Sequence, residues 1–147
     1  MLRAIVGLAA LVLCATVVLA QNTAAVTTRK DAMKQLGGAA KDPGGMLKGE
    51  VPFDLAKVQA SLKTIESVGA KGKTLFPDDS KGGDTAALPV AFTDKAGLFA
   101  KFDKMAADAK AAQAAIKDEA SFKGEMPKVF ASCGGCHKVY RKPPPAK

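Results

Sequence analysis

Apolar residues recur at helical spacing in four separate segments of this 147-residue chain, and no segment shows the strict alternation of a strand. The segments cover residues 22–42, 54–69, 94–118 and 119–142. Their connections are short, long and short, an order typical of an antiparallel four-helix bundle. The pattern therefore predicts an all-α protein built from one bundle.

Several residues mark where these helices should begin, bend or end. Asp54 is a favoured N-cap residue before the second segment. Pro43 is expected to stop or kink the first helix, at about Asp42, and Pro127 to kink the fourth. Residues 72–92 are rich in Gly, Pro and Asp, and a loop of this length in a small domain usually covers something or carries a function. The third helix is expected to bury the stripe Phe99, Phe102, Met105, Ala109 and Ile116.

The first twenty residues predict an export signal. Arg3 precedes an apolar run that ends at Ala20 in a small-x-small cleavage pattern. We expect cleavage there, which removes Cys14 and leaves residues 21–147 as one periplasmic domain without stable membrane insertion. The formal net charge of +8, which becomes +7 when Arg3 is removed with the signal, suits association with acidic proteins or membrane surfaces. The alternative is that the lysines only solvate the helices. No nucleic-acid partner is expected, because the chain has no Trp, one Tyr and lysines spread along its length.

The two cysteines and one histidine of residues 21–147 all lie in Cys133-Gly134-Gly135-Cys136-His137. On a helix, the two thiols and the imidazole stand at i, i+3 and i+4, so they project from one face. Thiols so placed can add to the two vinyl groups of a haem, while the imidazole reaches the iron. The motif therefore predicts one covalently attached haem c per chain, with Cys133 and Cys136 as attachment points and His137 as an iron ligand.

Three other uses of the motif fit the sequence less well. A zinc site needs about four ligands, and residues 21–147 contain no further Cys or His. A thioredoxin-like dithiol belongs on a strand–helix scaffold, which the helical pattern does not provide. A disulfide across two residues closes a loop too small to contribute much chain entropy.

The motif lies near the C-terminus and continues as Cys133-x-x-Cys136-His137-x-x-Tyr140-Arg141. Together with "TTRKDAMK" in the first helix, "GEVPFD" before the second and "LFPDDSKGGDTAALPVAF" in the long loop, it resembles the class II c-type cytochromes, the cytochrome c-prime superfamily. The likeness covers essentially the whole chain after the signal. It implies a four-helix haem domain and a homodimer formed through the first two helices.

The resemblance implies two candidate functions. In cytochrome c-prime proper, an apolar or aromatic residue of the first helix blocks the iron opposite the histidine, and the five-coordinate, high-spin haem binds gases such as nitric oxide. In a low-spin branch, a methionine one turn after a family arginine ligates the iron, and the protein carries electrons. Here these residues are Arg29 and Met33. We therefore expect a non-enzymatic electron carrier with His137 and Met33 as iron ligands; the gas-binding protein is the alternative.

The resemblance also implies roles for two arginines. Arg29 and Arg141 are expected at the haem edge, where their charge can pair with the propionates; the alternative for both is a solvated surface arginine. Arg141 lies at i+4 from His137 and therefore on the same side of the helix. Tyr140 is expected to be structural. The other methionines of the domain, Met46, Met105 and Met126, are weaker ligand candidates than Met33.

Overall fold

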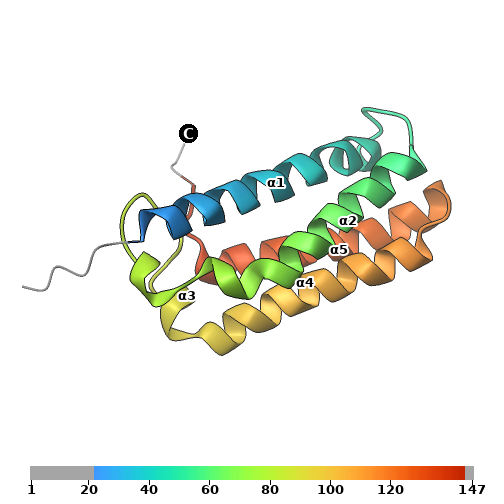
Figure 1. Cartoon of the computed structure of the whole chain (residues 1–147). Helices are drawn as coiled ribbons and strands as arrows, with labels where there is room; N and C mark the ends of the chain where they lie inside the picture. Colours follow the sequence, from blue (N-terminus) through green and yellow to red (C-terminus); the bar gives the residue numbers. More distant parts are fainter. Residues whose placement is uncertain (1–21, 145–147) are drawn as a thin grey trace, which may run out of the picture.

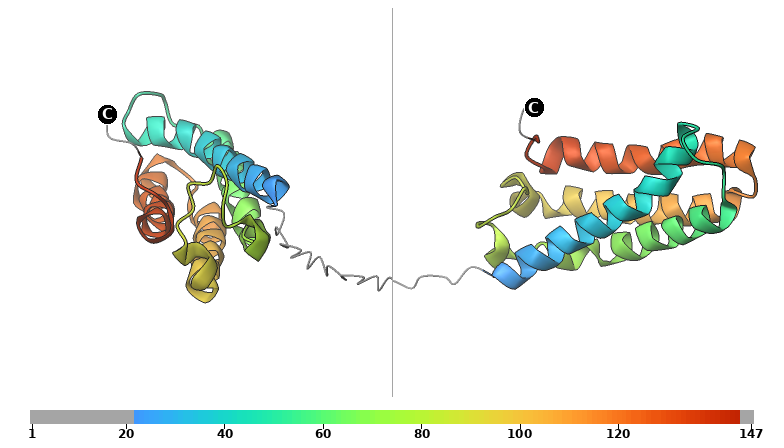
Figure 2. Two further views of the ribbon diagram at one scale, coloured as in Figure 1. Left: turned by 90° about the vertical axis from the view of Figure 1, so that its left-hand side faces the viewer. Right: turned by 90° about the horizontal axis from the view of Figure 1, so that it is seen from above.

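The computed structural model describes residues 22–144, which form an antiparallel bundle of four long helices (Figures 1 and 2). The predicted all-α bundle is confirmed. The signal predicted over residues 1–20 lies outside the described residues. Within residues 22–144, no helix is both long enough and apolar enough to cross a bilayer. The long helices are α1 (Thr23–Leu47), α2 (Leu55–Lys71), α4 (Lys95–Ala115) and α5 (Glu119–Tyr140), and the segment between α2 and α4 holds η1 (Gly72–Leu75), η2 (Asp78–Ser80) and α3 (Val90–Thr93).

Each long helix begins at a side chain that accepts a hydrogen bond from a backbone N–H of its first turn. The predicted cap Asp54 accepts from the N–H of Lys57 at 3.1 Å. Asn22, Asp94 and Asp118 begin α1, α4 and α5 in the same way. These contacts satisfy backbone donors that have no partner inside the helix.

Two helix boundaries differ from the sequence prediction. Helix α1 continues through Pro43 to Leu47, so the stop expected at about Asp42 is wrong, while the alternative of a kink at Pro43 stays a prediction. The fixed φ of proline is compatible with a helix, and Pro43 is buried. Helix α4 ends at Ala115, where Ile116 becomes extended and inserts its side chain into the core. The turn that follows is closed by a capping box between Asp118 and Ser121.

The hydrophobic core lies mainly between α2, α4 and α5, while α1 packs on α2 and meets α5 only briefly. Helix α4 faces this core with Leu98, Phe102, Met105, Ala109 and Ala112. The expected residue Phe99 packs against this core but is only partly buried, and the neighbouring Leu98, which was absent from the expected stripe, is buried.

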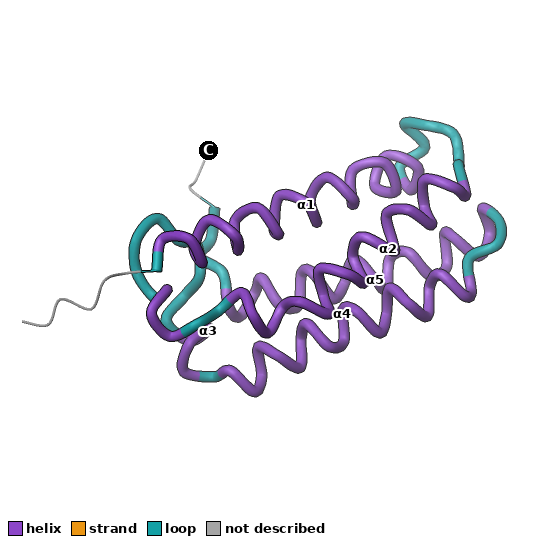
Figure 3. Tube along the Cα trace, viewed as in Figure 1, coloured by secondary structure: helices purple, strands orange, loops and turns teal. Residues whose placement is uncertain are grey.

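The long loop and its short helices lie at the end of the bundle where α1 begins and α5 ends (Figure 3). The backbone of this loop is bonded to the end of α5, since the N–H of Leu88 donates to Tyr140 O at 2.9 Å and the N–H of Lys142 donates to Ala86 O at 2.8 Å. The loop therefore covers the end of the bundle nearest to the Cys133–His137 motif.

Candidate haem site

Helix α5 turns both cysteines of the motif toward the bundle, whereas His137 is exposed. Its inward stripe consists of residues at alternating four- and three-residue steps: Phe122, Met126, Val129, Cys133, Cys136 and Tyr140. The stripe is buried before the motif and again at Tyr140, but both cysteines are only partly buried. Both thiols are free. The predicted placement of two thiols on one helix face is therefore present in the structure.

Helix α1 shows the same change of burial along its inward stripe. Val26 and Arg29 are buried at its start, and Pro43 and Met46 are buried near its end. Between them, Met33 and Leu36 are only partly buried, although they pack against the core. A Cβ added to Gly37 or Gly38 would meet no other atom within 4 Å.

These half-covered positions fit a flat apolar cofactor. Met33 and Leu36 on α1 and Cys133 and Cys136 on α5 are inward-facing, and all four pack against the same hydrophobic core. A haem attached at the two cysteines would complete the burial of such side chains, which is favourable because it removes apolar surface from water. The donor set also suits haem iron, since imidazole nitrogen and thioether sulfur are both common axial ligands.

Burial sets the protonation of the motif. It raises the pKa of the Cys133 and Cys136 thiols above the ordinary cysteine value. Burial, and secondarily the positive charge of Arg141, lowers the pKa of His137. A lowered pKa favours the neutral imidazole, which is the form that binds a metal. Among residues 22–144, no group of three or more His, Cys, Asp or Glu side chains is arranged to hold a metal ion by itself.

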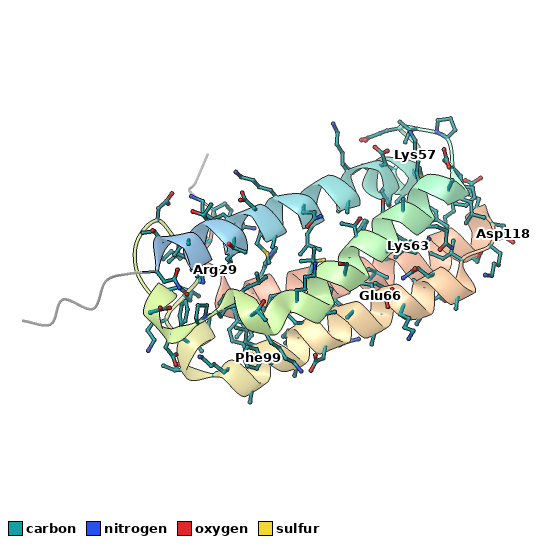
Figure 4. The ribbon with its side chains drawn as sticks, viewed as in Figure 1. Arg29, Lys57, Lys63, Glu66, Phe99 and Asp118 are labelled. Atoms are coloured by element: carbon teal, nitrogen blue, oxygen red, sulfur yellow. The ribbon has the colours of Figure 1, made fainter. Side chains whose placement is uncertain are left out.

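Arg29 lies at the loop end of the bundle with its side chain turned into the protein (Figure 4). It is only 4% exposed. Its two terminal nitrogens donate hydrogen bonds to four acceptors in the loop, at Leu75, Ser80 and Thr85. The propionate role of Arg29 stays a prediction, and the structure adds a set of loop partners that the sequence did not reveal.

Arg141 and Tyr140 end the same helix in different ways. Arg141 is exposed, and its backbone N–H donates to His137 O at 3.2 Å. Its propionate role also stays a prediction. Tyr140 is buried, and its hydroxyl donates to Asp94 Oδ2 at 2.6 Å. The predicted structural role of Tyr140 agrees with this contact, which joins the end of α5 to the cap of α4.

Sequence reasoning missed the polar partners in the loop. Ser80 and Thr85 accept from Arg29 across more than fifty positions of the chain. Nothing local distinguishes these hydroxyls from the other loop residues. The available signal was Arg29 itself, because an arginine on the inward stripe of a helix needs buried acceptors.

Comparison with known proteins agrees with this fold and site. The chain is 49% identical over 121 residues to cytochrome c' from Rhodopseudomonas palustris, covering 82% of this chain and 83% of that protein. It is 36% identical to cytochrome c-556 from the same organism, covering 96% and 97% of the two chains.

Solved structures give the same result. Cytochrome c' from Rhodopseudomonas palustris superimposes with a TM-score of 0.80 at 48% identity, over 82% of this chain and 98% of that one. Oxidised cytochrome c556 from R. palustris gives 0.77 at 27% identity, over 84% and 99%. A nitric oxide complex of a cytochrome c prime variant from Alcaligenes xylosoxidans gives 0.73 at 25% identity, over 84% and 98%. The cytochrome c' family profile matches residues 24–141. The chain therefore belongs to the cytochrome c' family, and its cofactor is a covalently bound haem c.

Proposed function

We propose that this protein is a periplasmic carrier of single electrons, not an enzyme, in which His137 and Met33 bind the haem iron from opposite sides. Cys133 and Cys136 would hold the haem through thioether bonds. When bound, the haem supplies reversible one-electron chemistry. The protein's own residues supply attachment, two axial ligands and burial, which together set the reduction potential.

The observation that carries this proposal is the position of Met33. It lies on the inward stripe of α1, one turn after Arg29, and packs against the same core as both cysteines. Among the described residues, the other methionines, Met46, Met105 and Met126, are at most 5% exposed and fill the core. Met33 alone of this set is partly exposed, so its thioether is not already enclosed by protein atoms.

The distribution of charge supports an acidic redox partner. Each carboxylate of the described residues has a basic or hydrogen-bonding partner, as at Asp84, which pairs with Lys30. Lys101, Lys138, Arg141 and Lys142 have no carboxylate within ion-pair distance in residues 22–144. Three of these four lie within five residues after His137, while the other lysines without such a partner in the described residues are spread over the rest of the bundle: Lys41, Lys63, Lys71, Lys110 and Lys117. Positive charge gathered after His137 would steer acidic proteins toward the haem.

Gas binding is the second candidate, and a specific finding favours it. The relative at 49% identity is a cytochrome c', and a cytochrome c prime of the same fold has been solved as a nitric oxide complex. In that case Met33 would pack beside the iron without binding it. The two candidates differ in one bond, so a spectrum separates them.

The test compares two methionines of α1. Met33→Leu keeps the apolar volume but removes the sulfur, whereas Met46→Leu makes the same change in the core. If Met33 binds iron, the purified holoprotein is low-spin, it resists carbon monoxide, and Met33→Leu becomes high-spin while Met46→Leu does not change. A wild-type protein that is already high-spin and takes up carbon monoxide readily would establish the gas-binding candidate instead.

The attachment residues have a separate test. Haem that stays with the polypeptide after extraction with acidified acetone is covalently bound. Cys133→Ala and Cys136→Ala should each leave at most one thioether, which shifts the absorption of the reduced pyridine haemochrome. An unshifted spectrum in both variants would exclude these cysteines as the attachment points.

The predicted homodimer remains part of the proposal. A shallow groove between α1 and α2 is lined by Gln35, Gly38, Ala39, Ala60, Ser61 and Thr64, and such small side chains permit close approach of a second copy. Sedimentation of the holoprotein at rising concentration tests this, and a mass that stays that of one chain would contradict it.

A further inference from the structure

Helices α1 and α5 carry the two proposed iron ligands but make little direct contact with each other. Both are instead bonded to the loop between η1 and α3. On the α5 side, the N–H of Leu88 donates to Tyr140 O and the N–H of Lys142 donates to Ala86 O, and Ala87 pairs with Arg141. These bonds lie within one or two turns of His137. The loop is therefore fixed to the helix that carries the proximal ligand.

On the α1 side, the main connection is the guanidinium of Arg29. Nη1 donates to Leu75 O and to Ser80 Oγ, both at 3.0 Å, and Nη2 donates to Ser80 O at 3.1 Å and to Thr85 Oγ1 at 2.9 Å. All four terminal N–H groups thus bond to the loop. The guanidinium carbon also lies 4.9 Å from the ring centre of Phe76, a distance at which a cation is attracted to an aromatic face.

Thr85 joins the two sides of this connection. Its Oγ1 accepts from Arg29 and from the N–H of Ala87, and its carbonyl accepts from Lys142 Nζ at 3.1 Å. A continuous path of hydrogen bonds therefore runs from Arg29 through Thr85 to the residues just after the motif. Because Arg29 is buried, water cannot easily replace the bonds at its end of the path, whereas the bond from Lys142 is exposed.

We infer that Arg29 is a positioning residue for the distal ligand. Through Thr85 and the loop it fixes α1 relative to α5, and Met33 lies one helical turn from it on the same face. The inference rests on the proposed ligation by Met33. It assigns Arg29 a task different from pairing with a propionate, since its terminal donors are already used by the loop.

The experiment weakens the path at two points. Arg29→Met removes the donors but retains a long apolar chain against Phe76. Thr85→Val removes the shared acceptor Oγ1 and leaves the arginine charge in place, so a propionate role predicts no effect of this variant. Arg29→Lys retains the charge with fewer donors and is expected to rescue only part of the function.

The measured quantity is the fraction of molecules in which Met33 is dissociated from the iron. In the ferrous holoprotein, carbon monoxide binds only when the methionine is off, so its apparent affinity rises in proportion to that population. We expect the affinity to rise about tenfold in Arg29→Met and several-fold in Thr85→Val. The sulfur-to-iron charge-transfer band of the ferric protein should weaken in the same order, at temperatures well below unfolding.

Two controls separate positioning from general destabilisation. Lys34→Met removes one exposed charge from α1, at the residue that directly follows Met33. Val58→Ala weakens the core of α2, where Val58 is fully buried. Both variants should leave the carbon monoxide affinity unchanged, although Val58→Ala lowers the unfolding temperature. Unchanged affinity in both Arg29→Met and Thr85→Val would overturn the inference.

A second measurement keeps the inference separate from the proposed function. If wild-type protein lacks the charge-transfer band, Met33 is not a ligand and the proposed function fails. Hydrogen exchange of the α1 backbone around Met33 then decides whether Arg29 holds this helix. Faster exchange in Arg29→Met and Thr85→Val, but not in Lys34→Met, supports the positioning role, and equal exchange in all three refutes it.

Discussion

At the scale of single residues, Tyr140 links the end of the haem-bearing helix to the start of α4. Its hydroxyl donates to Asp94 Oδ2, and Asp94 Oδ1 accepts from the N–H of Gly97. The bond to Asp94 raises the pKa of Tyr140 to about 12. The same bond, with that from Gly97, lowers the pKa of Asp94.

These two pKa shifts predict that the hydrogen bond between Tyr140 and Asp94 stabilises the fold only within a pH range, with an upper limit set by Tyr140 and a lower limit set by Asp94. The pKa of Tyr140 is higher in the folded protein than the value of about 10 expected after unfolding. Its stabilising contribution is therefore complete below pH 10 and is lost as the pH rises through 12. The pKa of Asp94 is lowered by folding, so its contribution is present above the ordinary carboxyl pKa and is lost as the pH falls through the lowered value.

Ultraviolet titration can measure the shift of Tyr140 directly, because the chain has only one tyrosine. We expect little phenolate in the native holoprotein between pH 9 and 11, and a normal titration near pH 10 in denaturant. Asp94→Asn should move the native titration back toward pH 10. Native wild-type protein that titrates near pH 10 would show that the contact does not perturb Tyr140.

At the scale of elements, α4 packs closely on one glycine of α2, Gly69, and on one of η1, Gly72. A Cβ at Gly72 would lie 2.1 Å from the ring of Phe102, and a Cβ at Gly69 would lie 3.0 Å from Ala106. The buried ring of Phe102 also packs on Phe76, with ring centroids 5.8 Å apart, and so has little room to move.

Alanine scanning of glycines tests this close approach. Gly72→Ala is expected to lower the free energy of unfolding by about 1–3 kcal/mol, because the added methyl group displaces a packed ring. Gly124→Ala is the matched control, since Gly124 is exposed on α5 and its Cβ would meet nothing within 4 Å. That change should raise the free energy of unfolding by about 0.5–1 kcal/mol through helix propensity. Denaturant unfolding of both holoproteins gives the two values, and equal effects would contradict the close approach.

At the scale of the whole molecule, the excess positive charge is not evenly compensated. Many lysines are paired on the surface, but Lys138 and Lys142, just after the motif, have no carboxylate within ion-pair distance in the described residues. Lys63, on the exposed side of α2, is equally unpaired (Figure 4). The same change of charge can therefore be made close to the motif, at Lys138 and Lys142, and away from it, at Lys63.

The effect of charge reversal on the rate of electron transfer is expected to depend on where the charges lie rather than on the net charge. The double variant Lys138→Glu/Lys142→Glu should slow oxidation of the reduced holoprotein by anionic ferricyanide several-fold at low ionic strength. Lys63→Glu/Lys110→Glu changes the net charge equally and should have a much smaller effect. The difference should vanish near 1 M salt, where charges are screened within about 3 Å. Equal slowing by both pairs would show that electrons do not enter beside the motif.

The sequence alone determined the helical architecture and the haem-binding motif. Helical periodicity and N-caps are local patterns, and Cys133, Cys136 and His137 are spaced by a single turn, so neighbouring residues suffice to predict both. The resemblance to a known family then placed Met33 as the residue on which the function depends. Errors arose where a local signal was ambiguous, as with the stop expected before Pro43, which lies inside α1, and with the end of the third helix, expected at about Asp118 and found at Ala115.

Only the tertiary structure decided what surrounds those residues. Arg29 lies 46 positions before Leu75 and 56 before Thr85, and no local pattern pairs a helix residue with acceptors so distant in a loop. The same holds for the approach of Gly72 to Phe102 and of Tyr140 to Asp94. Such contacts form because buried polar groups must bond to one another once water is excluded. Buried apolar groups, in turn, must fit the space that their closely packed neighbours leave.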